Sequence, residues 1–217
     1  MKIKLTASFD DGSMYDLRIA DLMYRHSIPT TFYIPVNYVK YLHSKGIPAI
    51  PETLLKAIAE NFEIGSHGVN HELLTRVDKD TQDFEINESK AELESMFNRP
   101  ITKFCYPRGY YTTDIIDIVR GAGYTEARTV KVGELNPAKD PLERHTTVHV
   151  GLDRKEYGTD WLTYAEKKLD EALAKVRRGE EVDYHFWGHS AEIEKNDQWE
   201  RLIQFLEYID ENRKWVE

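Results

Sequence analysis

The stretch KIKLTASFDDGSMYDLRIADLMYRHSIPTTFYIPV, residues 2–36, spans a complete strand–helix–strand unit. Residues 2–9 are predicted to form a strand that leads into the turn DDGS, and residues 14–26 to form a helix. Residues 28–36 are predicted to form the next strand, because β-branched and aromatic side chains fit a half-buried pleated surface. A strand, a helix and a strand in succession are typical of a parallel α/β sheet.

The same alternation continues to the end of the chain. Further strands are predicted at residues 62–67, 101–107, 143–150 and 182–189. Further helices are predicted at residues 53–60, 86–97, 114–124, 161–179 and 199–213. About seven strands that alternate with helices predict a parallel sheet or barrel. No linker, repeat or low-complexity stretch interrupts the pattern, so we expect residues 1–217 to form a single domain.

The composition limits the classes of partner. The 217 residues are 41% hydrophobic and 31% charged, which fits a soluble domain with a large core. A net charge of −9 disfavours nucleic acids and anionic membranes, because both bind basic surfaces. The N-terminus lacks the apolar run of a secretory signal and no membrane-spanning apolar run occurs, so a cytoplasmic location is expected. A small-molecule or oligosaccharide substrate fits this chain better, and the oligomeric state is left open.

Polar residues cluster where the predicted strands end, at the edge where α/β folds place their chemistry. The first strand ends in Asp10 and Asp11, and the motif GSHGVNH carries His67 and His71 four positions apart. Residues four apart share one face of a helical turn, so both imidazoles are predicted to reach one ion. A catalytic zinc typically takes three protein ligands. The third has to be a carboxylate, from Asp10 or Asp11, because Cys105 is the only cysteine.

Four motifs occur in the order SFDDG, GSHGVNH, YPRG and WGHS. Together they resemble the successive motifs of the polysaccharide deacetylases, also called the NodB-homology domain or carbohydrate esterase family 4. The resemblance covers nearly the whole chain. It implies a distorted (β/α) barrel and one bound divalent metal ion, usually zinc. Histidine and carboxylate ligands also accept cobalt, iron and manganese.

The resemblance also implies roles for individual residues. Asp11, His67 and His71 are the implied metal ligands, and Asp10 is the implied catalytic base. His189, in the WGHS motif, is the implied general acid. Adjacent side chains at a strand end point in different directions, so one aspartate can bind the ion while its neighbour stays free.

The YPRG motif carries one implied function and one departure from the family pattern. The backbone N–H of Arg108 is the implied donor to the oxyanion that forms during acyl transfer. The commonest form of this motif has an arginine that pairs with the catalytic aspartate, at the position where this chain has Cys105. A cysteine cannot orient Asp10. We hypothesise that Arg144 pairs with Asp10 instead, with a surface salt bridge of Arg144 as the alternative.

Four residues are predicted to contact the substrate. Pro107 and Tyr110 border the cleft expected at the YPRG turn, although Tyr110 is equally well explained as half-buried aromatic surface. The resemblance implies that Trp161 lines an acetyl pocket, and the alternative is a core tryptophan at a helix start. Trp187 is either a wall on which a sugar stacks or a core residue.

Three further histidines are assigned no chemistry. His185 lies inside the last predicted strand and is expected in the core or behind the site. His145 and His149 alternate with threonines and are expected to be ordinary strand residues.

The predicted activity is metal-dependent hydrolysis of an N-acetyl group on an amino sugar, an oligosaccharide or a polysaccharide, with acetate released through a metal-activated water. One alternative keeps the site but hydrolyses another C–N bond, in a cyclic imide, a ureide or another small amide. A second alternative is a sugar-binding protein without activity, which the complete set of predicted site residues argues against. A third is an Fe(II) oxygenase, since two histidines and one carboxylate also bind that metal, although the many predicted helices disfavour it.

Overall fold

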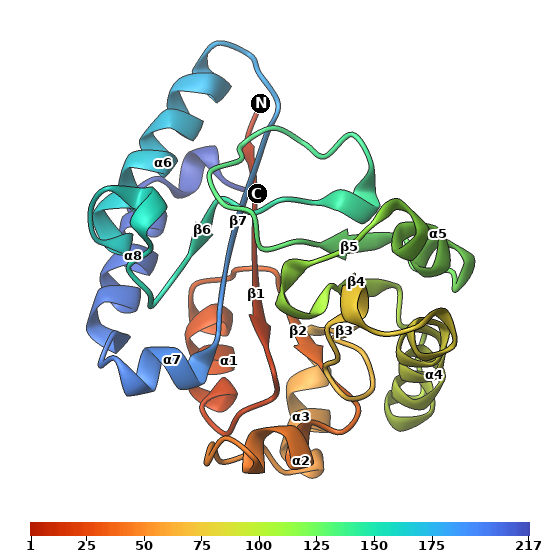
Figure 1. Ribbon diagram of the computed structural model, residues 1–217. Helices are drawn as coiled ribbons and strands as arrows, with labels where there is room; N and C mark the ends of the chain where they lie inside the picture. Colours follow the sequence, from red (N-terminus) through yellow and green to blue (C-terminus); the bar gives the residue numbers. More distant parts are fainter.

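Seven parallel strands form one sheet that curls into a half-barrel, with helices packed outside it (Figure 1). The computed structural model describes all residues from Met1 to Glu217. The strand order is β5-β4-β3-β2-β1-β7-β6. The strands are β1 (Ile3–Asp10), β2 (Thr30–Ile34), β3 (Glu63–Ser66), β4 (Lys103–Cys105), β5 (Glu126–Arg128), β6 (Val148–His149) and β7 (Val182–Gly188). The predicted α/β class, with about seven parallel strands in a distorted (β/α) barrel, is confirmed.

Eight α-helices connect and cover the strands. They are α1 (Asp16–Arg25), α2 (Tyr38–His43), α3 (Glu52–Ala59), α4 (Lys79–Phe97), α5 (Thr113–Gly121), α6 (Trp161–Arg177), α7 (Ser190–Lys195) and α8 (Trp199–Glu211). The side chains of Asp78, Thr112 and Asp160 cap α4, α5 and α6 by accepting from backbone N–H groups of the first turn. None of the helices combines the length and the apolar character that crossing a membrane requires.

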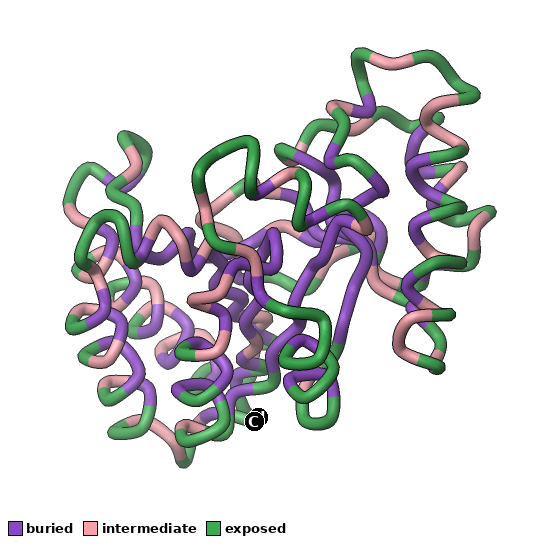
Figure 2. Tube along the Cα trace, turned by 90° about the horizontal axis from the view of Figure 1, so that it is seen from below, coloured by how far each residue is buried: buried purple, intermediate pink, exposed green.

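The core lies between the sheet and the helices. Figure 2 shows buried residues along the central strands and exposed residues on the outer turns of the helices. Helix α8 buries one face against the sheet, as its periodicity predicts, through Trp199, Leu202, Leu206 and Ile209. Each helix therefore contributes an apolar stripe to one continuous core.

The structure adds helices α2 and α7, which were not predicted, and α4 begins at Lys79 rather than at residue 86. Two strand regions also differ from the prediction. Strand β5 was not anticipated, because three residues are too few to show a period of two. The strand predicted at 143–150 shrinks to β6, and the segment before β6 runs between the two edges of the sheet. There the backbone N–H of Arg144 donates to the carbonyl of Ala127 in β5, and that of Thr147 donates to the carbonyl of His185 in β7. This segment bridges the gap that the curled sheet leaves between its edge strands.

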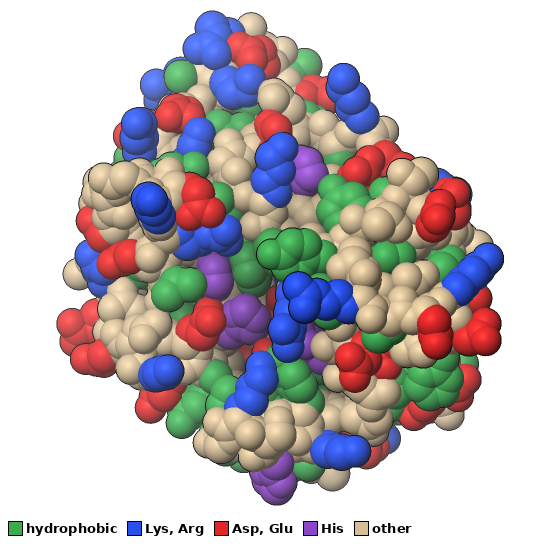
Figure 3. Space-filling model, viewed as in Figure 1, with side chains coloured by type: hydrophobic (Ala, Val, Ile, Leu, Met, Phe, Trp, Pro, Cys, Tyr) green, Lys and Arg blue, Asp and Glu red, His purple; other side chains and the backbone are tan.

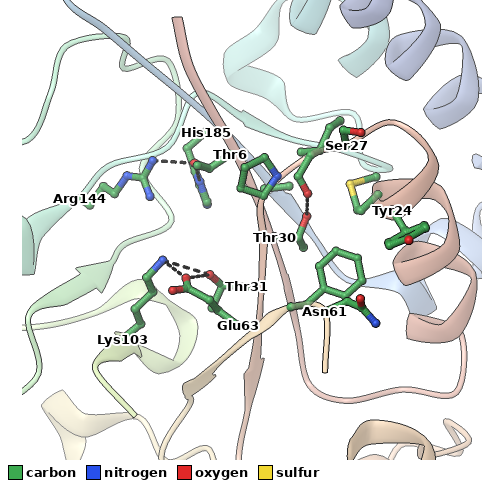
Figure 4. Close-up of a pocket in the computed structure, with 15 residues that line it drawn as sticks. Thr6, Tyr24, Ser27, Thr30, Thr31, Asn61, Glu63, Lys103, Arg144 and His185 are labelled. Atoms are coloured by element: carbon green, nitrogen blue, oxygen red, sulfur yellow. Dashed lines mark hydrogen bonds and ion pairs between the residues drawn. The ribbon is translucent and has the colours of Figure 1, made fainter. Parts of the chain in front are cut away.

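A cavity of about 590 Å³ opens at the amino ends of the strands (Figure 4). Its charged groups are paired with one another or with neighbouring residues. Lys103 contacts Glu63, and His185 bonds through both ring nitrogens to the hydroxyl groups of Thr6 and Ser8. His185 therefore has the structural position that its sequence context indicated. A cavity whose polar groups already satisfy one another has no group left that requires a ligand.

Candidate active site

A second cavity, of about 280 Å³, lies at the opposite ends of the strands, where the sequence motifs converge. Most of the predicted site residues line it, namely Asp10, Asp11, His67, His71, Arg108, Trp187 and His189. Figure 3 shows histidine side chains next to lysine and arginine side chains near the middle of this face. Chemistry at the carboxyl ends of parallel strands is the arrangement expected for this class of fold.

Asp11, His67 and His71 form a compact group of metal-ligating atoms. The Oδ1 atom of Asp11 lies 3.9 Å from Nε2 of His67 and 3.7 Å from Nε2 of His71. Ligand atoms around a tetrahedral zinc are about 3.4 Å apart, given bond lengths near 2.1 Å. Oδ1 of Asp11 is buried and has no hydrogen-bond partner. Because an unsatisfied buried oxygen is costly, these residues fit a divalent cation.

Two features prepare the histidines to bind a metal. His67 donates from Nδ1 to the backbone carbonyl of Cys105 at 2.8 Å, which leaves the lone pair of Nε2 directed at Asp11. Burial lowers the pKa of both His67 and His71. Both rings are therefore neutral at pH 7, which is the protonation state that coordinates metals.

The two histidines are not on a helical turn, so that part of the prediction is wrong. Residues after β3 form an irregular turn in which Gly68 and His71 adopt φ angles of 81° and 59°. The buried carboxylate of Glu85, in α4, accepts from the backbone N–H groups of Val69 and Asn70 at 2.9 Å. A Cβ atom at position 68 would lie 2.8 Å from Oε2 of Glu85, so the turn requires glycine. His67 and His71, four residues apart, therefore both face Asp11 because the hydrogen bonds to Glu85 fix the turn between them.

Asp10 is the last residue of β1, directly before Asp11, and its side chain is paired with Arg128. Nη2 of Arg128 donates to Oδ1 of Asp10 at 2.6 Å and also contacts Oδ2, with both side chains buried. Burial alone would raise the pKa of Asp10, but the charge of the Arg128 guanidinium and its hydrogen bond to the carboxylate outweigh burial and lower the pKa. Asp10 is therefore an ionised carboxylate beside the ligand group.

The hypothesis that Arg144 pairs with Asp10 is wrong. Arg144 donates to Asp183 from Nε at 2.9 Å and from Nη2 at 2.6 Å, and Figure 4 shows its side chain at the cavity of the amino ends. The physical reason lies in the register of the sheet, which pairs Cys105 with Arg128 on the neighbouring strand. The small Cys105 side chain leaves room for the Arg128 guanidinium at the place where the family motif usually has its own arginine.

His189 lies across the cavity from the histidine pair, and Glu192 orients its ring. His189 donates from Nδ1 to Glu192 at 2.9 Å, while its Nε2 lies 3.9 Å from Oδ2 of Asp11. His149 donates from Nε2 to the same Glu192 oxygen at 3.0 Å and stacks on Trp187. Burial alone would lower the pKa of His189, but Glu192 and Asp11 raise it to about 9. His189 is therefore a protonated donor at neutral pH.

The family assignment follows from a match that covers more than half of the chain. The sequence profile described as "Polysaccharide deacetylase" matches residues 2–127. The chain belongs to the polysaccharide deacetylase family. The matched part contains Asp10, Asp11 and both histidines of the GSHGVNH motif, and it ends one residue before Arg128.

Solved structures with the same fold include other polysaccharide deacetylases. A putative polysaccharide deacetylase from Mycobacterium smegmatis has a TM-score of 0.66 at 14% identity, covering 96% of this chain and 84% of that one. The Streptococcus pyogenes deacetylase PplD, in complex with acetate, has a TM-score of 0.56 at 21% identity, covering 64% of this chain. This chain spans only 62% of the length of PplD. These identities, all under 25%, establish the fold alone.

A pseudoenzyme also shares the fold. The carbohydrate esterase family 4 pseudoenzyme from Bacillus anthracis has a TM-score of 0.60 at 17% identity, covering 99% of this chain and 63% of that one. No curated protein matches this chain significantly. Because a pseudoenzyme has the same fold, whether this member of the polysaccharide deacetylase family is active depends on the residues in its cavity.

The predicted substrate contacts fall in different places in this deacetylase-family chain. Trp187 lines the cavity, and the Arg128 guanidinium lies 4.5 Å from the centre of its ring. Pro107 is buried and Tyr110 is 61% exposed, and neither lines the cavity. Trp161 packs in the core and donates from Nε1 to a glutamine of the loop before α8, so the alternative of a core tryptophan describes its position.

Added zinc is expected to bind the chelator-treated protein at one equivalent and to raise its Tm, because the ligand group is complete only in the folded chain. Asp11→Asn and His67→Ala should each abolish both effects, since each removes a ligand atom. His145→Ala is the matched control, because this histidine lies outside the cavity. Titration calorimetry and thermal unfolding measure both quantities, and unchanged binding by the Asp11→Asn protein would contradict the proposed ligand set.

A double-mutant cycle tests which arginine partners Asp10. Arg128→Met is expected to lower the free energy of unfolding by about 3–5 kcal/mol, because Asp10 is left buried without its partner charge. Asp10→Asn should restore most of that loss in the Arg128→Met background and none of it in the Arg144→Met background. Asp183→Asn should show the reverse pattern. Urea unfolding at pH 7 measures all the variants, and coupling of Arg144 with Asp10 would overturn the assignment.

Proposed function

We propose that this chain is a metal-dependent hydrolase that removes an N-acetyl group from an amino sugar or oligosaccharide, releasing acetate and a free amine. The observation that carries the proposal is the convergence of Asp10, the ligand group Asp11–His67–His71 and His189 on one cavity. Family membership supports it. A divalent metal held by Asp11, His67 and His71 would supply a Lewis acid for the acyl carbonyl and for water.

In this proposal Asp10 acts as the general base. Its Oδ2 atom lies 4.0 Å from Nε2 of His67, and the carboxylate is paired with Arg128, so it borders the ligand group while it is bound to a different partner. Arg128 keeps Asp10 ionised and fixes its rotamer. A water that approaches the ligand group therefore meets a carboxylate able to accept its proton while its oxygen attacks the acyl carbon.

His189 and Arg108 complete the proposed machinery on the other walls. The Nε2 atom of His189 carries a proton that the departing amine can take, because Nδ1 is already bonded to Glu192. Arg108 has a φ angle of 58°, and its backbone N–H donates to no backbone carbonyl. That N–H is available to stabilise the negative charge on the acyl oxygen.

The size of the cavity supports a second candidate. A cavity of about 280 Å³ suits a monosaccharide-sized compound better than a long stretch of polymer. The same machinery would hydrolyse another C–N bond, in a cyclic imide or a small amide, because these bonds also need an activated water and a protonated leaving nitrogen. Retention of Asp10, Asp11, both ligand histidines and His189 argues against a non-catalytic sugar-binding protein.

Acetate release tests the proposed reaction. Zinc-loaded protein should release acetate from at least one N-acetylated amino sugar, and chelator-treated protein should not. Asp10→Asn should lower kcat by about 10²–10⁴-fold with zinc binding intact, since it removes the base and leaves the ligands. Ring-opened half-amide from a cyclic imide, or ammonia from a small primary amide, with no acetate from any sugar, would instead favour the second candidate.

Glu192 should act as a positioning residue for His189. Glu192→Gln is expected to lower kcat for an N-acetyl sugar by about 10–100-fold with KM unchanged. The same variant should hydrolyse p-nitrophenyl acetate at the wild-type rate, because that leaving group departs without protonation. Glu194→Gln is the control, since Glu194 lies on the same short helix and does not line the cavity. Equal losses on both substrates would show that Glu192 has only a structural role.

A further inference from the structure

Two cations at the catalytic cavity have no anionic partner. Lys45 and Arg108 both line the cavity, and neither forms an ion pair with any residue of the chain. The larger cavity differs, because there Lys103 is bound to Glu63 (Figure 4) and Arg144 is bound to Asp183. Both side chains are exposed to solvent at the cavity, in a chain whose net charge is −9.

The carboxylates of the cavity do not neutralise these two cations. Asp10 is bound to Arg128, and Glu192 accepts from two histidines. Asp11 faces the two ligand histidines. None of these three carboxylates forms an ion pair with Lys45 or Arg108, so the two positive charges at the cavity are not neutralised by the chain.

Both residues border the cavity that contains the ligand group. The ammonium of Lys45 lies 4.0 Å from the centre of the Tyr41 ring, and that ring stacks on His71 at 4.4 Å. Arg108 belongs to the turn after β4, where its φ angle of 58° lies in a region that side chains disfavour. Lys45 and Arg108 thus come from two different loops that border the same cavity.

We propose that the substrate of this site carries an anionic group, a phosphate or a carboxylate, that Lys45 and Arg108 bind while the acyl group lies at the metal ligands. The inference rests on the proposed function and adds the substrate class. A guanidinium binds two oxygens of a phosphate or carboxylate in parallel, and an ammonium adds a compact point charge. An N-acylated sugar phosphate or sugar acid fits both this recognition and the small cavity.

A matched substrate series tests the charge requirement. N-acetylglucosamine, N-acetylglucosamine 6-phosphate and N-acetylglucosaminuronate share one ring and one acetamide, and differ in the group at C6. Zinc-loaded protein should show a kcat/KM about tenfold higher for one or both anions than for the neutral sugar, as expected for a hydrogen bond to a charged group. The preference should fall as NaCl is added, because the cations are exposed to solvent. The two anions distinguish phosphate from carboxylate recognition.

Variants assign the preference to the proposed residues. Lys45→Met should lower the ratio of anionic to neutral kcat/KM by about tenfold. Lys40→Met is the matched control, because Lys40 is an exposed lysine on α2 that does not line the cavity, and it should leave the ratio unchanged. Equal kcat/KM for all three substrates would overturn the inference and leave the deacetylase proposal standing.

The two proposals can also fail separately. If no sugar releases acetate, the deacetylase proposal fails, and calorimetry on the zinc-loaded protein then decides the substrate class. Tighter binding of the 6-phosphate than of the neutral sugar, lost in Lys45→Met and kept in Lys40→Met, would support an anionic ligand. Equal binding, or a preference that Lys45→Met does not change, would overturn it.

Discussion

The buried ion pair between Asp10 and Arg128 is the constraint on which the geometry of the site depends. Asp10 ends β1 and Arg128 ends β5, and three strands separate them in the order of the sheet. Their side chains meet only because the sheet curls enough to bring β5 across the inside of the half-barrel. Removing two charges from water costs several kcal/mol per ion, so this pair persists only with close geometry. The curvature of the sheet, the strand register and the ionised state of Asp10 therefore depend on one another.

Three backbone positions around the cavity show the same connection between fold and site. Asp11, His71 and Arg108 all have positive φ angles, although each carries a full side chain. Such conformations are disfavoured by about 1 kcal/mol or more, and surrounding contacts have to impose them. At Asp11 the turn separates its carboxylate from that of its neighbour Asp10, which allows one to face the histidines and the other to face Arg128. The backbone conformation at each of these three residues therefore sets the direction of its side chain.

The features that depend on neighbouring residues could be predicted from the sequence. The contacts that depend on how distant strands align in the sheet could not. Alternating strands and helices can be recognised from short stretches of sequence, and so can the motifs that contain Asp11, His67 and His71. The partner of Asp10 is 118 residues away in the chain and sits on a three-residue strand without periodicity. Arg144 was a reasonable alternative, but the sheet register placed a different arginine beside Cys105.

The contacts that support the histidines were missed for the same reason. Glu85 lies in α4, one residue before the helix start predicted at 86, and its role appears only because α4 packs against the turn after β3. The contact between His189 and Glu192 is the one that the sequence could have indicated. Glu192 follows His189 by three residues at a helix start, a spacing that lets the two side chains meet. His149 became relevant only through its contact with Glu192.

The two ends of the barrel differ in whether their buried polar groups have partners. At the amino ends, Arg144, Asp183, Lys103 and Glu63 satisfy one another and stabilise the closure of the sheet without a ligand. At the carboxyl ends, Oδ1 of Asp11 remains without a partner. A buried oxygen left unsatisfied costs about 1–3 kcal/mol, so the fold tolerates this one at a cost that its packing elsewhere offsets. Because binding a cation recovers that free energy, the unsatisfied end of the barrel, although its cavity is the smaller, is the one arranged for chemistry.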